Sequence, residues 1–312
     1  MRIAIFGTGA VGGYFGGRLA AAGEDVTFIA RGGTLQALRT EGLRVESIKG
    51  DFLVRPAKAT DAPTEVGAVD IVLVAVKAWQ VEDAGKAMRP LVGAGTVVIP
   101  LENGVEAPEQ LAAALGRDHV AGGLCHVVAF QVAPGHIRHA GLEPDVAFGE
   151  PDGRESPRLE YLKRAFDRAG VKAELAQNIH VAMWEKFLFI ASVSGVGSVT
   201  RAPAGVMRTV PATRRLLESA MAEIVTVARA CGVTLPDDAP ARTMAFIDAL
   251  PEGATASMQR DILSGRPSEL EAQNGAVVRL GRENGVDTPV NGFIYSALLP
   301  QELRARGRVP FD

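Results

Sequence analysis

The sequence predicts an α/β fold, with an N-terminal Rossmann-type doubly wound sheet and a C-terminal all-helical domain. In the first half of the chain, apolar runs rich in β-branched residues alternate with helical stretches, beginning with the run 2–6. From Asn178 onward, the apolar residues recur instead with the spacing of helices. We therefore place a domain boundary near Gln177, between a Rossmann domain of residues 1–177 and a helical domain of residues 178–312.

The strands of the first domain are predicted from their composition. The run 70–76 is almost continuously apolar, as expected for a parallel strand that is covered on both faces. The runs between 120 and 149 are separated by turn residues, so we expect them to be antiparallel additions. The predicted strands are 2–6, 25–30, 70–76, 96–100, 120–132, 135–139, 146–149 and 171–175, with helices at 10–22 and 157–169.

The second domain is predicted to consist of helices. Gly232 and Gly285 follow two of these helices, at positions where glycine commonly ends a helix. The predicted ranges are 178–193, 209–231, 239–250, 257–264, 269–284 and 291–305.

Composition narrows the classes of partner. The 312 residues carry a formal net charge of −3 without a block of Lys and Arg, so nucleic acid is not an expected partner. The apolar stretch 187–200 is too short and too rich in Ser and Gly to span a bilayer, so no membrane partner is expected. Cys125 and Cys231 are far apart in the sequence, which fits a reducing cytoplasm and two buried structural thiols. His136 and His139 lack further clustered ligands, so no metal site is predicted.

A glycine-rich turn connects the first strand to the first helix. It follows the G-x-G-x-x-G pattern, in which glycines allow a tight turn, a close approach of the backbone to a pyrophosphate and close packing of helix on strand. The free N–H groups of the helix N-terminus then face the anion. The sequence therefore predicts a dinucleotide site, the alternative being a turn that serves packing alone. Its residues are Gly7, Thr8, Gly9, Ala10, Val11 and Gly12.

The end of the second predicted strand indicates which dinucleotide is bound. A site specific for NAD would place Asp or Glu there, to bind the ribose 2′-hydroxyl. This chain has Ala30-Arg31-Gly32-Gly33 instead. Because the Arg31 guanidinium can pair with a 2′-phosphate, NADP(H) is the predicted cofactor. An exposed loop arginine is the alternative.

Polar residues follow two of the predicted parallel strands. Lys77 ends the run 70–76, and Asn103 follows the run 96–100. Ligands of open α/β sheets bind outside the carboxyl ends of the strands, so both residues are candidates for binding. A solvated lysine and an ordinary Asn-Gly turn are the alternatives.

Lys186 lies in a strongly apolar helix. Between Ile179 and Thr200, Glu185 and Lys186 are the only Asp, Glu, Lys or Arg residues, so we expect the helix to be buried nearly all round. Partial burial disfavours the charged form of an ammonium group, which suits proton donation near neutral pH. The alternative is a packed stem with the ammonium group in water.

A third polar cluster contains Ser257 and the segment Arg266-Pro267-Ser268-Glu269. Ser268 is the expected N-cap of a helix that begins at Glu269. Glu269 then lies in the first turn, near the positive end of the helix dipole. Spacing alone therefore favours a structural role for Ser268 and Glu269 at the start of this helix.

Taken together, these segments resemble the ketopantoate reductases over essentially the whole chain. The resemblance implies an enzyme that reduces 2-dehydropantoate to (R)-pantoate with NADPH, in coenzyme A biosynthesis. The motifs occur in the family's order, as Gly7–Gly12, Lys77-Ala78-Trp79-Gln80, Glu102-Asn103-Gly104, Trp184-x-Lys186, Ser257-Met258 and Arg266-Pro267-Ser268-Glu269.

The resemblance also implies roles for single residues. Lys186 is implied as the catalytic lysine, and Glu269 as the active-site glutamate. The implied substrate contacts are Asn103 and Ser257, and Ser194, at a position where the family often has an asparagine, is a third candidate. The implied cofactor contacts beyond the glycine-rich turn are Arg31, Lys77 and Asn103.

The chain departs from the family pattern on the helix that carries Lys186. Where the family often has asparagines one and two turns after the lysine, this chain has Ile190 and Ser194. A missing hydrogen-bond partner can change discrimination between substrates by orders of magnitude. The alternatives are therefore a reductase of another 2-oxo acid or of an imine, and a non-catalytic NADP(H)-binding sensor. A small 2-oxo acid is the expected partner, and a second copy of the chain is a further candidate.

Overall fold

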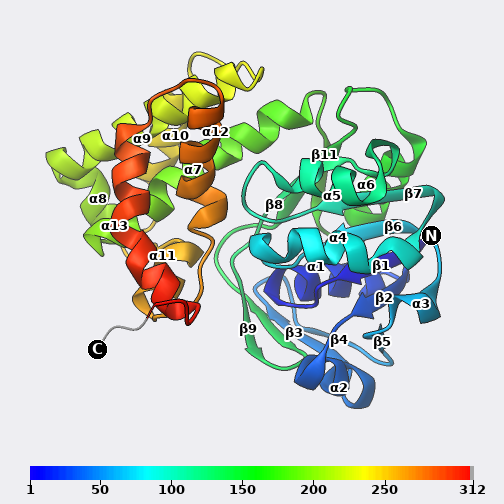
Figure 1. Ribbon diagram of the computed structural model, residues 1–312. Helices are drawn as coiled ribbons and strands as arrows, with labels where there is room; N and C mark the ends of the chain where they lie inside the picture. The colour runs from blue at the N-terminus through cyan, green and yellow to red at the C-terminus, as the bar shows by residue number, and fades with distance from the viewer. Residues whose placement is uncertain (310–312) are drawn as a thin grey trace. The chain divides into compact units, whose positions relative to one another are not determined.

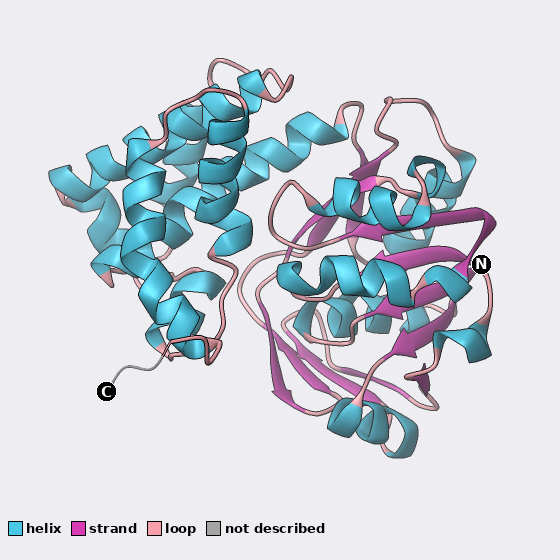
Figure 2. Ribbon diagram, in the orientation of Figure 1, coloured by secondary structure: helices cyan, strands magenta, loops and turns pink. Residues whose placement is uncertain are grey.

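The computed structural model describes residues 1–309 and divides into two compact units. The first unit contains Met1–Glu102 and Ala107–Ala182, and the second contains Asn103–Glu106 and the chain from Met183 onward. All strands of the described residues lie in the first unit, and the second is built from helices (Figure 2). The α/β prediction, with a helical C-terminal part, is therefore confirmed.

The main sheet of the first unit has five parallel strands in the order β5-β2-β1-β6-β7 (Figure 1). The chain moves from β1 outward to β2 and β5, and then crosses to β6 on the other side of β1. The strand order therefore reverses beside β1 and β6, and ligands of such sheets bind at the carboxyl ends of those strands. The bounds are β1 Arg2–Phe6, β2 Asp25–Ile29, β5 Lys58–Thr60, β6 Val69–Val74 and β7 Val92–Pro100.

Helices cover both faces of this sheet, which explains why its strands are apolar throughout. Ile5 of β1 belongs to a buried cluster with Phe15 of α1, whereas the next residue, Phe6, belongs to a second cluster with Leu111 of α5. Successive side chains of a strand point to opposite faces, so β1 contributes to both cores. The helical segments of this unit are α1 Ala10–Ala21, α2 Gly32–Thr40, α3 Pro63–Val66, η1 Ala78–Gln80, α4 Val81–Ala87, η2 Arg89–Leu91, α5 Ala107–Leu115, η3 Arg117–His119 and α6 Pro157–Arg168.

Two smaller sheets complete the first unit, in the orders β4-β3-β10-β9 and β12-β11-β8. The prediction of purely antiparallel additions is wrong in part, because β10 pairs with β3 and β11 with β12 in parallel. In each pair the two strands are far apart in the sequence, so the turn residues next to a strand do not reveal its parallel partner. The predicted strand 120–132 is divided into β8 and β9. The bounds are β3 Leu43–Ser47, β4 Phe52–Val54, β8 Gly122–His126, β9 Ala129–Ala133, β10 His136–His139, β11 Asp145–Gly149 and β12 Lys172–Leu175.

The helices of the second unit differ from the prediction at several boundaries. α7 continues to Thr200 instead of ending at 193, because its late glycines allow other side chains to pack closely against it. The predicted helix 209–231 corresponds to α9, which begins two residues later at Pro211, whereas the short α8 before it was not predicted. The bounds are α7 Ile179–Thr200, α8 Ala204–Thr209, α9 Pro211–Ala230, α10 Ala239–Ala249, α11 Ser257–Leu263, the π-helix η4 Glu271–Gly275, α12 Ala276–Glu283 and α13 Pro289–Ala305.

Two sequence expectations concern membranes and thiols. α7 is long and apolar enough to cross a membrane, yet 61% of its most apolar 18-residue window is buried within the protein, so this is weak evidence for a span. Cys125 is buried as expected, but Cys231 is only partly buried. The reason is its position directly after α9, where the chain turns at the surface. Burial, together with the charges of Glu283 and Glu106, raises the pKa of the Cys231 thiol.

Candidate functional site

The glycine-rich turn of the first unit is shaped by close backbone contacts. Gly7 has a φ of +98°, and a Cβ atom there would lie 2.8 Å from Ala75 O. A Cβ at Gly12 would clash with Gly7 O and lie 2.9 Å from Ile5 Cγ2. These contacts hold the turn after β1 against the turn after β6, at the point where the strand order reverses.

The N-terminus of α1 is open to an anion. Gly9 is its N-cap without a side-chain capping bond, and the first intrahelical bond runs from Gly13 N to Gly9 O at 2.8 Å. The N–H groups of the first turn therefore have no partner within the helix. No acidic side chain lies in that turn. A Cβ at Gly9 would meet no heavy atom of residues 1–309 within 4 Å, so the turn fits a pyrophosphate.

Substitutions at two glycines are expected to separate cofactor binding from folding. Gly9→Ala should leave thermal unfolding nearly unchanged, because the added methyl group enters open space, but it should weaken NADPH binding where the pyrophosphate approaches. Gly12→Ala should destabilise the unit by roughly 1–3 kcal/mol, because it overpacks the contact with Gly7 and Ile5. Thermal unfolding and titration with NADPH would measure both effects. Unchanged NADPH affinity in Gly9→Ala would contradict the placement of the pyrophosphate.

Arg31 lies at the carboxyl end of β2 and is exposed, as the N-cap residue of α2. The turn after β1 is bonded to the same strand end, because Gly7 N donates to Ile29 O at 3.2 Å and Thr8 Oγ1 donates to the same oxygen at 3.3 Å. Within residues 1–309, the Arg31 guanidinium makes no hydrogen bond or ion pair. Arg31 is therefore available to an anionic group beside the glycine-rich turn.

Lys77 lies in the turn after β6 and not at the end of the strand itself. The prediction that the strand extends to 76 is wrong, because β6 ends at Val74 and the Glu102 carboxylate accepts the Val76 N–H at 3.0 Å, which draws the chain toward the end of β7. Lys77 precedes η1, and its Nζ lies 5.8 Å from the centre of the Trp79 ring. A Cβ at Gly7 would lie 2.8 Å from Val76 Cγ1, so Lys77 is one residue from a contact with the glycine-rich turn.

In the second unit, Asn103 and Glu269 are brought together. Asn103 Nδ2 donates to Glu269 Oε2 at 3.2 Å, and the Glu269 side chain is largely buried. The next residue, Gly104, has a φ of +125°, and its Cβ position lies 3.2 Å from Ala272 O. The short segment Asn103–Glu106 therefore packs on the turn that carries Glu269.

An ion pair that the sequence analysis did not predict holds this segment. The Arg279 guanidinium of α12 donates to both carboxylate oxygens of Glu106, at 2.6 and 3.2 Å, and also contacts Glu271. Burial lowers the pKa of Arg279, but the two carboxylates outweigh it, so the net shift is upward. Tyr295 donates to Glu271 at 2.7 Å, and burial followed by this contact raises the pKa of Tyr295 to about 12. No local sequence signal could have revealed the pairing of Glu106 with Arg279.

Glu269 does not begin a regular α-helix as expected. The predicted helix 269–284 starts instead with the π-helix η4 and becomes α-helical at Ala276. Gly275 N donates to Leu270 O at 2.9 Å, which is the five-residue bond of a π turn. Single π turns inside helices are frequent at functional sites. The cap expected at Ser268 is present as a bond from Leu270 N to Ser268 Oγ at 3.2 Å.

Lys186 lies on α7 and is partly exposed. The expectation of burial all round the helix is therefore wrong for this turn, where the adjacent Glu185 carboxylate forms an ion pair with Arg242. Trp184 and Phe187, on either side, are buried and contact each other edge to face at 5.5 Å. In the described part of the chain, the Lys186 ammonium group makes no hydrogen bond or ion pair.

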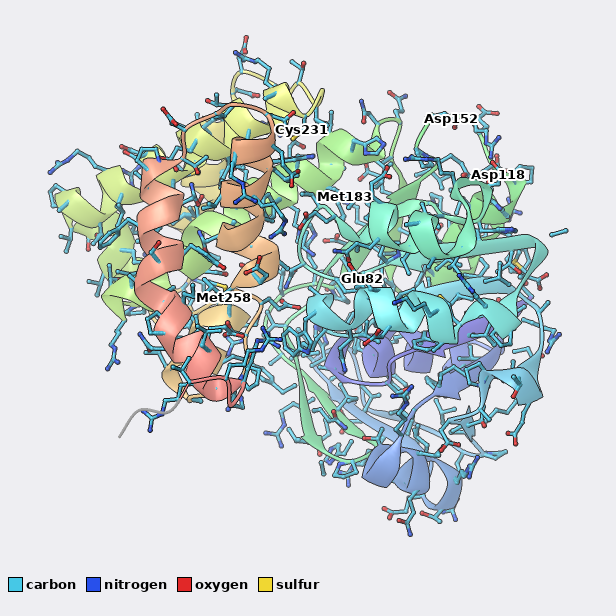
Figure 3. All side chains as sticks on the ribbon, viewed as in Figure 1. Glu82, Asp118, Asp152, Met183, Cys231 and Met258 are labelled. Carbon is cyan, nitrogen blue, oxygen red and sulfur yellow. The ribbon has the colours of Figure 1, made fainter. Side chains whose placement is uncertain are left out.

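The remaining predicted substrate residues lie on α7 and α11. Ile190 is one turn after Lys186 and is partly exposed, whereas Ser194 is fully buried and its Oγ has no partner among residues 1–309. Ser257 is the first residue of α11, partly exposed, and precedes the buried Met258 (Figure 3). A Cβ at Gly197 of α7 would lie 2.9 Å from Gln259 Cδ of α11, so these two helices are in direct contact.

The structure thus divides the predicted residues between the two units. The glycine-rich turn, Arg31 and Lys77 belong to the first unit, which offers a site for a dinucleotide. The second unit holds an ammonium group, a buried carboxylate, an amide and hydroxyl groups, a set that can bind and protonate a small polar substrate. These residues are Lys186, Glu269, Asn103, Ser194 and Ser257. Within the described residues, no group of three His, Cys, Asp or Glu side chains could hold a metal ion.

Comparisons with known proteins identify the family of this chain. Residues 3–153 match the family model described as ketopantoate reductase PanE/ApbA, and residues 178–302 match the model of its C-terminal part. The chain is 31% identical to an uncharacterized oxidoreductase, YkpB, of Bacillus subtilis over 96% of this chain and 98% of that one. It is 30% identical to a 2-dehydropantoate 2-reductase of Nostoc, covering 95% and 94%. A PanE/ApbA family ketopantoate reductase from Ralstonia eutropha superimposes with a TM-score of 0.89 at 31% identity, covering 98% and 100%.

Proposed function

Because this chain belongs to the ketopantoate reductase PanE/ApbA family, we propose that it reduces 2-dehydropantoate to (R)-pantoate with NADPH. Membership of the family makes the chain an oxidoreductase. We propose 2-dehydropantoate as its substrate and NADPH as its preferred cofactor. The observation that carries it is the contact between Asn103 and the buried Glu269, on the same unit as Lys186. A cofactor-binding sensor would need the glycine-rich turn and Arg31, but not this set of polar groups.

The first unit binds the cofactor through residues that fit a phosphorylated dinucleotide. The N–H groups at the start of α1 bind the pyrophosphate, and Arg31 binds the 2′-phosphate. Lys77, in the turn after β6, adds a second positive charge beside the glycine-rich turn. When bound, a nicotinamide cofactor supplies the hydride that reduces the ketone.

The second unit binds and protonates the substrate. Negative charge develops on the ketone oxygen during reduction, and the Lys186 ammonium group stabilises this charge and donates the proton. Glu269 accepts a hydrogen bond from a substrate hydroxyl group, or orients Lys186. Asn103, which is held by Glu269, orients the substrate together with Ser257.

The oxidation of NADPH with a panel of 2-oxo acids tests this function. The panel would contain 2-dehydropantoate, analogues of it without the hydroxyl group, 2-oxo acids with aliphatic and aromatic side chains, and a cyclic imine. The highest kcat/KM is expected for 2-dehydropantoate. NADPH binding without turnover of any member would favour a sensor, and a higher kcat/KM for another member would reassign the substrate.

A second candidate function is the reduction of another 2-oxo acid or of an imine, and Ile190 favours it. Ile190 lies one helical turn from Lys186 and is partly exposed, and it offers no hydrogen-bonding group. An apolar side chain at this position suits a substrate whose side chain is itself apolar. The panel above separates the two functions directly.

Replacement of Ile190 by asparagine tests the importance of this position. If an amide one turn after Lys186 binds the substrate hydroxyl group, Ile190→Asn should raise kcat/KM for 2-dehydropantoate several-fold more than for the analogue without the hydroxyl. A net hydrogen bond contributes roughly 0.5–1.5 kcal/mol, which sets this magnitude. Comparing two substrates on one variant cancels any shared loss of stability. Strong selectivity of the unmodified protein for 2-dehydropantoate would show that other groups hold the hydroxyl.

A further inference from the structure

The residue before Glu269 is held on every side by the C-terminal helix. Ser268 is fully buried, and its N–H donates to both carboxylate oxygens of Glu302, at 3.0 and 3.1 Å. Its hydroxyl group donates to Glu302 Oε2 at 2.6 Å. On the opposite side of the residue, Ser268 O accepts a bond from Arg306 at 2.9 Å. The N–H, hydroxyl and carbonyl groups of Ser268 are therefore all bound by α13 or by the residue that follows it.

Glu302 and Arg306 form an ion pair with each other. Arg306 Nε lies 2.6 Å from Glu302 Oε1, one helical turn apart, and the Glu302 side chain is 5% exposed. A buried carboxylate is costly unless its charge is balanced and its oxygens accept hydrogen bonds. Here both conditions are met by one arginine and by Ser268. A buried salt bridge is weak evidence for stability, so its contact with Ser268 points to a role beyond stability.

We propose that Glu302 is a positioning residue for Glu269, acting through Ser268. The proposal rests on the proposed function, in which Glu269 contacts the substrate. Holding Ser268 at its N–H, carbonyl and hydroxyl groups fixes the direction in which the chain enters Glu269. The helix that follows acts only after this point, because its bond to Glu269 runs from Gln273 N to the Glu269 carbonyl oxygen at 3.0 Å. Glu302 thus orients the Glu269 carboxylate toward Asn103 from a helix that begins twenty residues later in the chain.

The expected consequence is a loss of catalysis without a loss of cofactor binding. A misplacement of about 1 Å in a reacting group can reduce the rate roughly a hundredfold. We expect Glu302→Gln to lower kcat/KM for the substrate about ten- to a hundredfold, because the amide retains one acceptor oxygen and loses the charge that binds Arg306. The Kd for NADPH should stay within about twofold. Ser268→Ala, which removes only the hydroxyl contact, should give a smaller loss in the same direction.

The chain offers a matched control at the other end of the same helix. Glu223 of α9 accepts the N–H groups of Val290 and Asn291 at 2.7 and 2.9 Å, so it too is a carboxylate that holds backbone N–H groups with α13. Among the described residues, Glu223 forms no hydrogen bond with Ser268 or Glu269, and its link to η4 runs through Asn291, which accepts a bond from Asn274. Glu223→Gln should therefore change thermal stability as Glu302→Gln does, but leave kcat/KM within about twofold.

A double-mutant comparison separates positioning from a structural role. If Glu302 acts through Glu269, Glu302→Gln should have little further effect on kcat/KM in a Glu269→Gln protein. Amide hydrogen exchange of the peptide containing Ser268 should also become faster in Glu302→Gln and not in Glu223→Gln. Equal losses of kcat/KM in both backgrounds, or an equal loss in Glu223→Gln, would overturn the proposal.

The failure of the proposed function would look different. Full activity of Glu269→Gln would show that Glu269 has no catalytic or binding role, while the faster exchange at Ser268 would still report the hold of Glu302 on the backbone. If Glu302→Gln does not fold, Arg306→Lys provides the second test. It keeps the charge beside Glu302 but removes the bond to Ser268 O, and an unchanged kcat/KM in that variant would count against the proposal.

Discussion

Replacement of Lys186 by alanine is expected to lower kcat by about 10²- to 10⁴-fold, the range that positioned general acids typically contribute. The Kd for NADPH should be nearly unchanged, because Lys186 acts on the charge that develops at the ketone oxygen and belongs to the unit without the glycine-rich turn. Stopped-flow or steady-state oxidation of NADPH would give kcat, and fluorescence titration would give the Kd.

Lys186→Met is the control for the packing of the lysine stem. Methionine keeps an unbranched apolar side chain at this position but carries no charge, so it should lose as much activity as alanine while preserving the helix. The partial exposure of Lys186 is also compatible with a stem that packs on α7 and an ammonium group that remains in water. Near-normal turnover in the methionine variant would establish that alternative.

Replacement of Arg31 by alanine is expected to remove most of the preference for NADPH over NADH. A charge-assisted hydrogen bond contributes roughly 1.5–3 kcal/mol, or about ten- to a hundredfold in affinity. The Arg31 side chain is exposed beside the glycine-rich turn, and no carboxylate at the end of β2 is present to bind a ribose 2′-hydroxyl group. Titration of the variant and the unmodified protein with both cofactors measures the ratio.

Arg39 provides the matched control on the same helix. It lies near the other end of α2, and its Nε donates to Ala59 O at 3.0 Å. Arg39→Ala removes one positive charge from α2 but should leave the ratio of the two affinities unchanged. Equal affinity of the unmodified protein for NADPH and NADH would refute the assignment of Arg31, whatever the variants show.

The parts of the fold that the sequence predicts well are those that depend on neighbouring residues. The apolar run 2–6, the glycine-rich turn and the helix from Ala10 are recovered within one residue, because strand, turn and helix start are each encoded within a few positions. The two small sheets were predicted less well. Their parallel pairs join strands such as β3 and β10, which are separated by most of the main sheet in the sequence.

The same distinction applies to the candidate site. Lys186, Glu269 and Asn103 were selected from local composition and from a resemblance between motifs, and their roles remain predictions. Neither source showed that Lys186 lies on a partly exposed turn, because burial depends on which helices pack around α7. Neither predicted the π turn after Glu269, since a π turn and an α turn differ by one backbone bond and have no distinct sequence pattern.

The sequence by itself determined the α/β class, the glycine-rich turn and the positive charge at the end of β2, because each depends on residues close together in the chain. Only the tertiary structure decided which distant residues hold Glu269 and its neighbours in place. Asn103 meets Glu269 across 166 residues, Arg279 meets Glu106 across 173, and Glu302 meets Ser268 across 34. Such pairs form because folding buries charged and polar groups that must then find partners, and the partner is chosen by the packing of helices rather than by the local sequence.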